Sequence, residues 1–160
     1  MSDRTVLRVP VEYGEVPDHV GLFKDRHLWK SEYVILDCCK NISRIAREIE
    51  IEVVDLGFVH EYDDVVRELD ALGLRPAIYP ELTSFIRRYP DTHSNYRLWN
   101  GVDLAAIGSY VRYGSVTRHH PAYQEDPDSG CWYLAWPSGF GYRDGSKVVY
   151  DRFLAVKKDA

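Results

Sequence analysis

The chain has 160 residues, with 20 Lys or Arg against 25 Asp or Glu, so its formal net charge is −5 when the histidines are neutral. Hydrophobic residues make up 45% and charged residues 28% of it, which excludes a disordered or collagen-like protein and predicts one globular domain over residues 1–160. The acidic balance, without a dense cluster of Lys and Arg, argues against a nucleic-acid partner.

The first predicted strand covers residues 6–13, where apolar side chains alternate from Leu7 to Tyr13. Pro10 lies inside this run and cannot donate a ladder hydrogen bond, so we expect an edge strand. Residues 14–48 are harder to interpret, because the short apolar run at 33–36 and the isoleucines that follow it allow either a strand or a helix.

The clearest strand begins at Glu48. Residues 48–53 alternate strictly between Glu and Ile or Val, and the apolar character continues to Val59. This pattern predicts a half-buried strand whose glutamates face water. We expect residues 49–158 to form the core of the domain and residues 1–48 to form an N-terminal extension.

Two helices are predicted next. Residues 63–72 carry one apolar stripe, begin with two aspartates and end at Gly73, which suits the position after a helix. The second helix begins at Pro80 and stops at Pro90. The segment between them, residues 73–78, is expected to be a tight link.

After residue 90 the sequence becomes rich in aromatic residues and glycine, and helical periodicity disappears. We predict short strands at about 104–113, 131–136 and 147–157, with a loop over residues 123–130 and a hairpin turn at Asp144-Gly145. Together these elements predict an α+β fold in which two helices pack on a mainly antiparallel sheet.

Metal and cofactor sites are not expected. His119 and His120 are adjacent, so they would point to opposite faces of a strand, and we interpret them as solvated loop residues. Asp126 and Asp128 lack the spacing of a calcium loop. The three cysteines, two of them adjacent, fit a reducing, cytoplasmic setting rather than a disulfide framework. No apolar run is long enough to cross a membrane, and the first residues do not form a signal peptide.

Tyrosine, tryptophan and arginine near the ends of the late strands are the best candidates for a binding surface, because such side chains combine a large contact area with few rotatable bonds. The alternative is that these side chains fill a small β-region. The candidates are Tyr110, Arg112, Tyr113, Trp132, Trp136, Tyr142 and Arg143.

Several stretches carry a family resemblance. The order of a strand, two helices and then short strands with tryptophans, together with the sequences at residues 64–77, 80–85, 131–134 and 150–157, resembles the C-type-lectin-like fold domains of bacterial and phage proteins. Gly-Leu-Arg-Pro-Ala at 73–77 and Arg-Phe-Leu-Ala-Val-Lys-Lys at 152–158 are the most characteristic segments. The resemblance implies a scaffold whose loops determine the function.

We therefore expect a non-enzymatic binding module that holds a protein or a small polar ligand, in a phage or defence-related context. A structural subunit of a phage or cell-surface assembly is a further possibility, and the oligomeric state stays open. The alternative from a different class is a small enzyme. Its site would comprise His119, His120, Asp126, Asp128 and Arg143.

Overall fold

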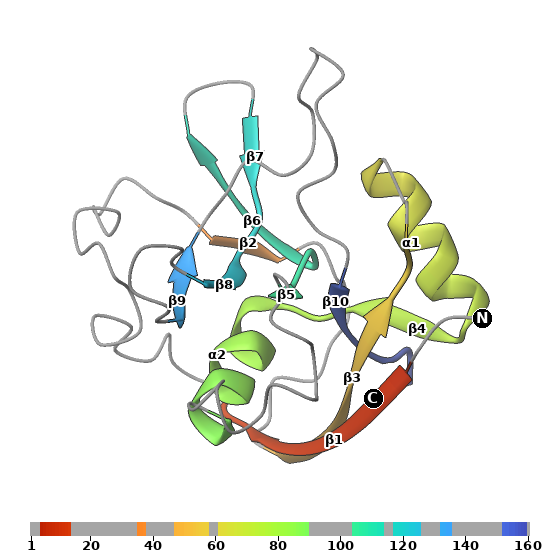
Figure 1. Ribbon diagram of the computed structural model, residues 1–160, viewed down its shortest axis with the longest axis vertical. Coiled ribbons are helices and arrows are strands. Elements are labelled where there is room, and N and C mark those ends of the chain that lie inside the picture. The colour runs from red at the N-terminus through yellow and green to blue at the C-terminus, as the bar shows by residue number, and fades with distance from the viewer. Residues whose placement is uncertain are drawn as a thin grey trace.

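The computed structural model describes residues 4–13, 35–37, 47–57, 61–89, 104–113, 117–125, 132–135 and 152–159. These ranges contain two helices and ten strands (Figure 1). In chain order they are β1 Arg4–Val11, β2 Ile35–Asp37, β3 Arg47–Asp55, α1 Tyr62–Ala71, β4 Leu74–Pro76, α2 Tyr79–Arg88, β5 Leu104–Ala105, β6 Ser109–Tyr113, β7 Thr117–His119, β8 Ala122–Glu125, β9 Trp132–Ala135 and β10 Arg152–Lys157.

The larger sheet has the strand order β1-β3-β10-β5-β8-β9, and β4 also pairs with β10. Its described pairs are antiparallel apart from β5 and β10, which run parallel. Strand β1 lies at one edge, as the proline at position 10 predicts, and pairs with β3 along its whole length. Residues 4–11 are thus built into the same sheet as the expected core.

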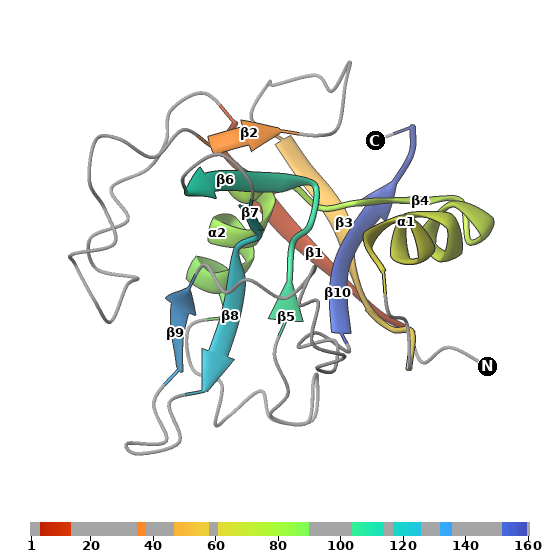
Figure 2. The ribbon, with the colours of Figure 1, turned by 90° about the horizontal axis from the view of Figure 1, so that it is seen from above.

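The two helices cover opposite faces of this sheet. Ile51 and Leu154 pack beneath α2, whereas Val54 and Phe153 pack beneath α1. Because successive strand residues point to opposite faces, these two sets belong to different sides of β3 and β10 (Figures 1 and 2). The predicted α+β class, with two helices on a mainly antiparallel sheet, is confirmed.

Local sequence signals fix the helix boundaries. Helix α1 lies within one residue of the predicted range, and Gly73 after it has a φ of 74°, a left-handed conformation that favours glycine. Helix α2 has Pro80 in its first turn and ends before Pro90. Leu69 of α1 and Phe85 of α2 are fully buried against their respective faces of the sheet.

The prediction that the glutamates of β3 face water is wrong at one position. Glu48 and Glu50 are at least partly exposed, but Glu52 is only 2% exposed. Strand β3 is an inner strand, and Glu52 has Val6 as its partner on one side and Ala155 on the other. Glu52 is therefore buried between two neighbouring strands, although the alternation of the sequence predicts that it faces solvent.

The late part of the chain is more divided than predicted. The expected strand at 104–113 is two strands, β5 and β6, which belong to different sheets. The expected link at 73–78 contains β4, and β8 occupies the start of the expected loop at 123–130. Both β7 and β8 were missed.

Strands β9 and β10 lie inside the predicted ranges but are not neighbours. Strand β9 pairs with β8, whereas β10 pairs with β3, β4 and β5. The described residues of β9 and β10 therefore do not pair with each other. The Asp144-Gly145 turn itself lies outside the described residues.

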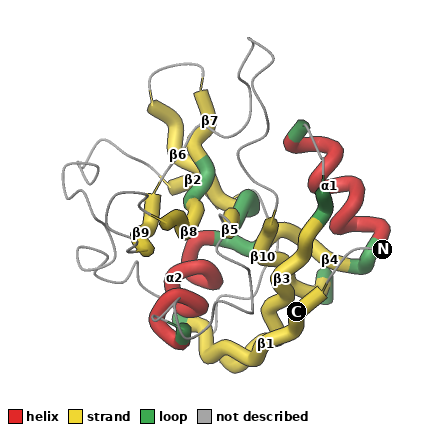
Figure 3. The backbone as a smooth tube through the Cα atoms, viewed as in Figure 1, coloured by secondary structure: helices red, strands yellow, loops and turns green. Residues whose placement is uncertain are grey.

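The smaller sheet has the order β2-β6-β7. Strand β2 overlaps the apolar run noted at 33–36. Figure 3 shows this sheet above the larger one, on the side away from β1. Across the part of the chain described here, no helix has the length and apolarity needed to cross a membrane.

Candidate functional site

The β6–β7 hairpin, residues 109–119, carries three of the predicted binding residues, and its base is fixed to the core. The backbone amide of Tyr79 donates to Ser109 Oγ at 2.7 Å, and Ser109 is fully buried. Next to it, the Gly108 amide donates to the Ala77 carbonyl at 2.8 Å. The first residue of β6 is thereby held against the N-terminus of α2.

His120, directly after β7, lies in a loop but is buried, so the prediction that it is solvated is wrong. Its exposed fraction is 1%, and its Nδ1 lies 2.9 Å from the carbonyl oxygen of Ser109. Since a carbonyl only accepts, Nδ1 carries the proton. The ring stacks on Tyr62 of α1 at 5.5 Å and meets the Tyr110 ring edge-on at 6.1 Å. His120 therefore joins the end of the hairpin to α1.

The register of the hairpin places two arginines opposite each other. Arg112 pairs with Arg118, and Tyr113 pairs with Thr117. Opposed positions of an antiparallel pair lie on the same face, and so do positions two residues apart along one strand. Tyr110, Arg112 and Arg118 thus occupy one face of the hairpin, which we call the cationic face. Opposed residues of like charge destabilise an antiparallel pair, and positions 112 and 118 both carry arginine.

The other predicted site residues are divided among several places. Tyr113 and His119 occupy hairpin positions on the face opposite to the cationic one. Trp132 belongs to β9 in the larger sheet, where it pairs with Glu125. The remaining predicted residues lie outside the described part of the chain: Trp136, Tyr142, Arg143, Asp126 and Asp128.

Arg118 was not among the residues singled out from the sequence. Arg118 is six residues after Arg112 in the sequence. This separation does not predict that the two residues face each other unless the two strands are known to pair. The short separation along the chain between residues 109–113 and 117–119 is the feature that could have suggested the pairing.

A second polar cluster, which sequence reasoning also missed, lies in the core beneath α2. The carboxylate of Glu81 is fully buried and accepts from Arg75 at 2.7 and 3.0 Å, from the Tyr13 hydroxyl at 2.7 Å and from the Ile78 amide at 2.8 Å. Burial, and then the negative charge of Glu81, raise the pKa of Tyr13 well above its usual value. With four donors on one carboxylate, the cluster is built to hold structure rather than to exchange protons.

Within the described ranges, no three His, Cys, Asp or Glu side chains lie together as a metal site would require. The expectation that the protein carries no metal and no cofactor stays a prediction, because Asp126, Asp128 and the cysteines lie outside those ranges.

Comparisons of the chain with known protein families, with curated proteins and with solved structures gave no match. The fold defines an α+β domain with helices on both faces of a mainly antiparallel sheet. Its function is inferred from the geometry of the site itself.

Proposed function

We propose that the protein is a non-enzymatic binding module whose β6–β7 hairpin holds an anionic group of a partner protein or of a small polar ligand. The observation that carries the proposal is the pairing of Arg112 with Arg118. An anion bound between them would remove their repulsion, and arginine binds carboxylates and phosphates through two parallel hydrogen bonds. Tyr110 on the same face adds an aromatic contact of the kind common in binding surfaces.

The anchoring of the hairpin supports this function. Ser109 and His120 fix the two ends of its base against α2 and α1 respectively. A surface that is already ordered loses little conformational entropy when it binds, which raises affinity without any additional contact. In this proposal Tyr113, Trp132, Trp136, Tyr142 and Arg143 remain candidate members of the binding surface.

The scaffold we propose is C-type-lectin-like. In support, the order of the described elements is the one on which the resemblance was drawn: strand β3, helices α1 and α2, then short strands that end in β10. Strand β10 returns to lie antiparallel beside β3, so the segment between them leaves and re-enters the sheet at neighbouring places. Variable loops on such a scaffold suit a binding protein in a phage or defence-related setting.

The alternative proposal, a small enzyme, loses His120 as one of its expected site residues. His120 is buried and stacked, and its Nδ1 proton is committed to the Ser109 carbonyl. A general acid or base must reach the proton that it transfers, and a ring held in this way is placed for packing.

The test uses a hexaglutamate peptide as the anionic probe and a hexaglycine peptide as the neutral comparison, with NMR chemical shifts and calorimetry as readouts. We expect hexaglutamate to shift the amides of the hairpin. Arg112→Gln and Arg118→Gln should each weaken binding by about tenfold, the loss of one charge-assisted contact, while the melting temperature is kept. Arg67→Gln on α1, an exposed arginine paired with Asp64, is the matched control and should bind as the parent does. Equal binding by all three variants, or no shift within the hairpin, would contradict the proposal.

A further inference from the structure

A pocket of about 510 Å³ opens where the end of β1, the start of β3 and the last turns of α2 meet. Three arginines line it, namely Arg47 from β3 and Arg87 and Arg88 from α2. Ser84, one turn before the two α2 arginines, lies on the same side of the helix and also faces the pocket. None of the described residues that line it belongs to the β6–β7 hairpin, so the pocket is treated as separate from the site proposed above.

Helix geometry accounts for only part of this positive charge. Arginines in a last helical turn interact favourably with the helix dipole, which explains Arg87 and Arg88 without any ligand. Arg47 is different, because it is the first residue of β3, opposite Val11, and its buried Nε has no hydrogen-bond partner among the residues that the structure describes. A buried donor of this kind costs free energy unless a ligand or water satisfies it.

The remaining lining sets the character of the ligand. Pro10 and Val11 give the pocket an apolar wall, and Glu12 and Glu48 add two negative charges. The side chain of Glu48 is 61% exposed and lies 3.9 Å from Arg8, which offsets part of its charge. Among the described lining residues, three arginines against two glutamates give an excess of one positive charge in a protein whose net charge is −5.

We propose that this pocket binds a small phosphate-bearing molecule. A phosphate group offers three oxygens and up to two charges, which matches three guanidinium groups better than a single carboxylate does. The pocket volume is in the range typical of small-molecule sites and exceeds what the phosphate alone would fill. The apolar wall at Pro10 and Val11 would contact the rest of the molecule, and the Ser84 hydroxyl would donate to a phosphate oxygen.

The experiment titrates the full chain with pyrophosphate at constant ionic strength, with citrate as the polycarboxylate comparison, and follows amide shifts and binding heat. We expect saturable pyrophosphate binding with shifts at residues 47–48 and 84–88. The double variant Arg87→Gln/Arg88→Gln changes two exposed side chains and should weaken binding at least about tenfold, with only the small loss of melting temperature that follows from removing two charges at the end of a helix.

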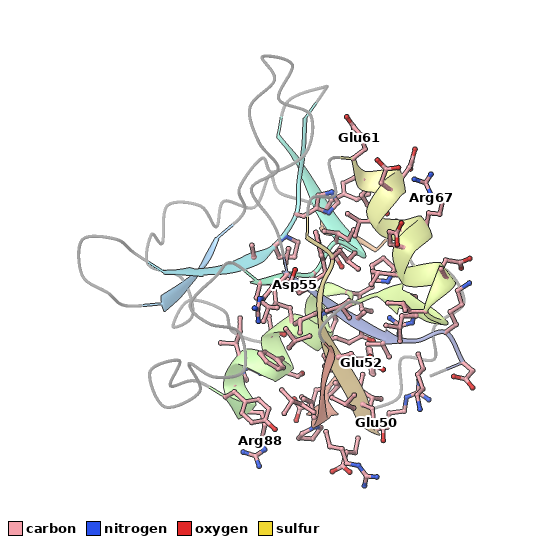
Figure 4. The ribbon with its side chains drawn as sticks, turned by 45° about the vertical axis from the view of Figure 1, so that its right-hand side comes forward. Glu50, Glu52, Asp55, Glu61, Arg67 and Arg88 are labelled. Atoms are coloured by element: carbon pink, nitrogen blue, oxygen red, sulfur yellow. The ribbon has the colours of Figure 1, made fainter. Side chains whose placement is uncertain are left out.

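Arg67→Gln is the control here too, since Figure 4 shows Arg67 on α1, far from Arg88 at the end of α2. The hairpin variant Arg112→Gln should leave the pyrophosphate-induced shifts at residues 47–48 and 84–88 unchanged, which separates this pocket from the hairpin site. Arg47→Gln should weaken binding as well, and if it fails to fold, the exposed double variant still decides the matter. Equal binding of citrate, shifts that avoid the pocket, or unchanged affinity in the double variant would overturn the proposal.

Discussion

The guanidinium of Arg75 and the carboxylate of Glu81 form a two-point ion pair in the core, with N···O distances of 2.7 and 3.0 Å. Arg75 lies in β4 and Glu81 in the first turn of α2, and the Tyr13 hydroxyl reaches the same carboxylate from the end of β1. The Glu81 carboxylate therefore joins three elements in the core: the end of β1, strand β4 and helix α2.

Removal of the carboxylate should destabilise the protein strongly. Glu81→Ala would take the carboxylate partner from the buried Arg75 guanidinium, and we expect a loss of about 3–5 kcal/mol in the free energy of unfolding. Tyr13→Phe removes one hydrogen bond to the same carboxylate and should cost about 1–3 kcal/mol. Urea denaturation measures both. A Glu81→Ala loss no larger than that of Tyr13→Phe would show that the pair is not desolvated as the structure has it.

Stability should fall at alkaline pH. The pKa of Tyr13 is raised by burial and by Glu81, and burial also raises the pKa of Tyr79. Below about pH 10 both tyrosines are neutral in the folded and the unfolded chain, so their contribution is constant. Above that pH the unfolded chain ionises while the folded chain stays protonated, and each tyrosine lowers the free energy of unfolding by up to about 1.4 kcal/mol per pH unit.

The difference between variants isolates this effect from other alkaline titrations. Denaturation of the parent protein, of Tyr13→Phe and of Tyr79→Phe at pH 8 and pH 11 should show the steepest loss in the parent. Parallel pH profiles for all three proteins would contradict the prediction.

The two helices should contribute separately to the core, because they pack on opposite faces of the sheet. Leu69→Ala in α1 and Phe85→Ala in α2 each create a cavity, and we expect losses of about 2–5 kcal/mol at either site. The two losses should be additive, since the sheet lies between them. Glu68→Ala, at an exposed position of α1, is the control. Losses below about 1 kcal/mol at both sites would contradict the packing of the helices.

Reversal of one charge in the hairpin should stabilise the unliganded protein. Arg118→Glu places an opposite charge across from Arg112, a change worth about 0.2–1 kcal/mol for opposed residues in an antiparallel pair. The double variant Arg112→Glu/Arg118→Glu restores a like-charged pair and should lose that gain. Thermal unfolding at low salt measures both. A single variant less stable than the double one would show that these positions do not face each other.

The sequence predicted those elements whose side chains alternate between core and solvent. Strand β3 and the two helices were found because periods of 2 and 3.6 follow directly from burial on one side. Local patterns carry no information about neighbours along the sheet, so the burial of Glu52 between Val6 and Ala155 was out of reach.

The candidate site was predicted only in part, for the same reason. Tyr110, Arg112 and Tyr113 were chosen by residue type, but the pairing of Arg112 with Arg118 depends on a hairpin that residue type does not reveal. His120 was misread because its partners, Tyr62 and Ser109, are 58 and 11 positions away. Polar side chains that become buried through such distant contacts are the hardest to recognise from sequence.

The central position of β10 has a consequence for how the protein is made in the cell. This strand is the neighbour of β3, β4 and β5, yet it is the last described strand to be synthesised. While the ribosome is still adding residues 152–157, β3 lacks the partner on its inner side, and the apolar faces of both helices have only part of their sheet to cover. Until residues 152–157 are available to pair, the inner edge of β3 and the single strands β4 and β5 therefore lack the neighbour that joins them into one sheet.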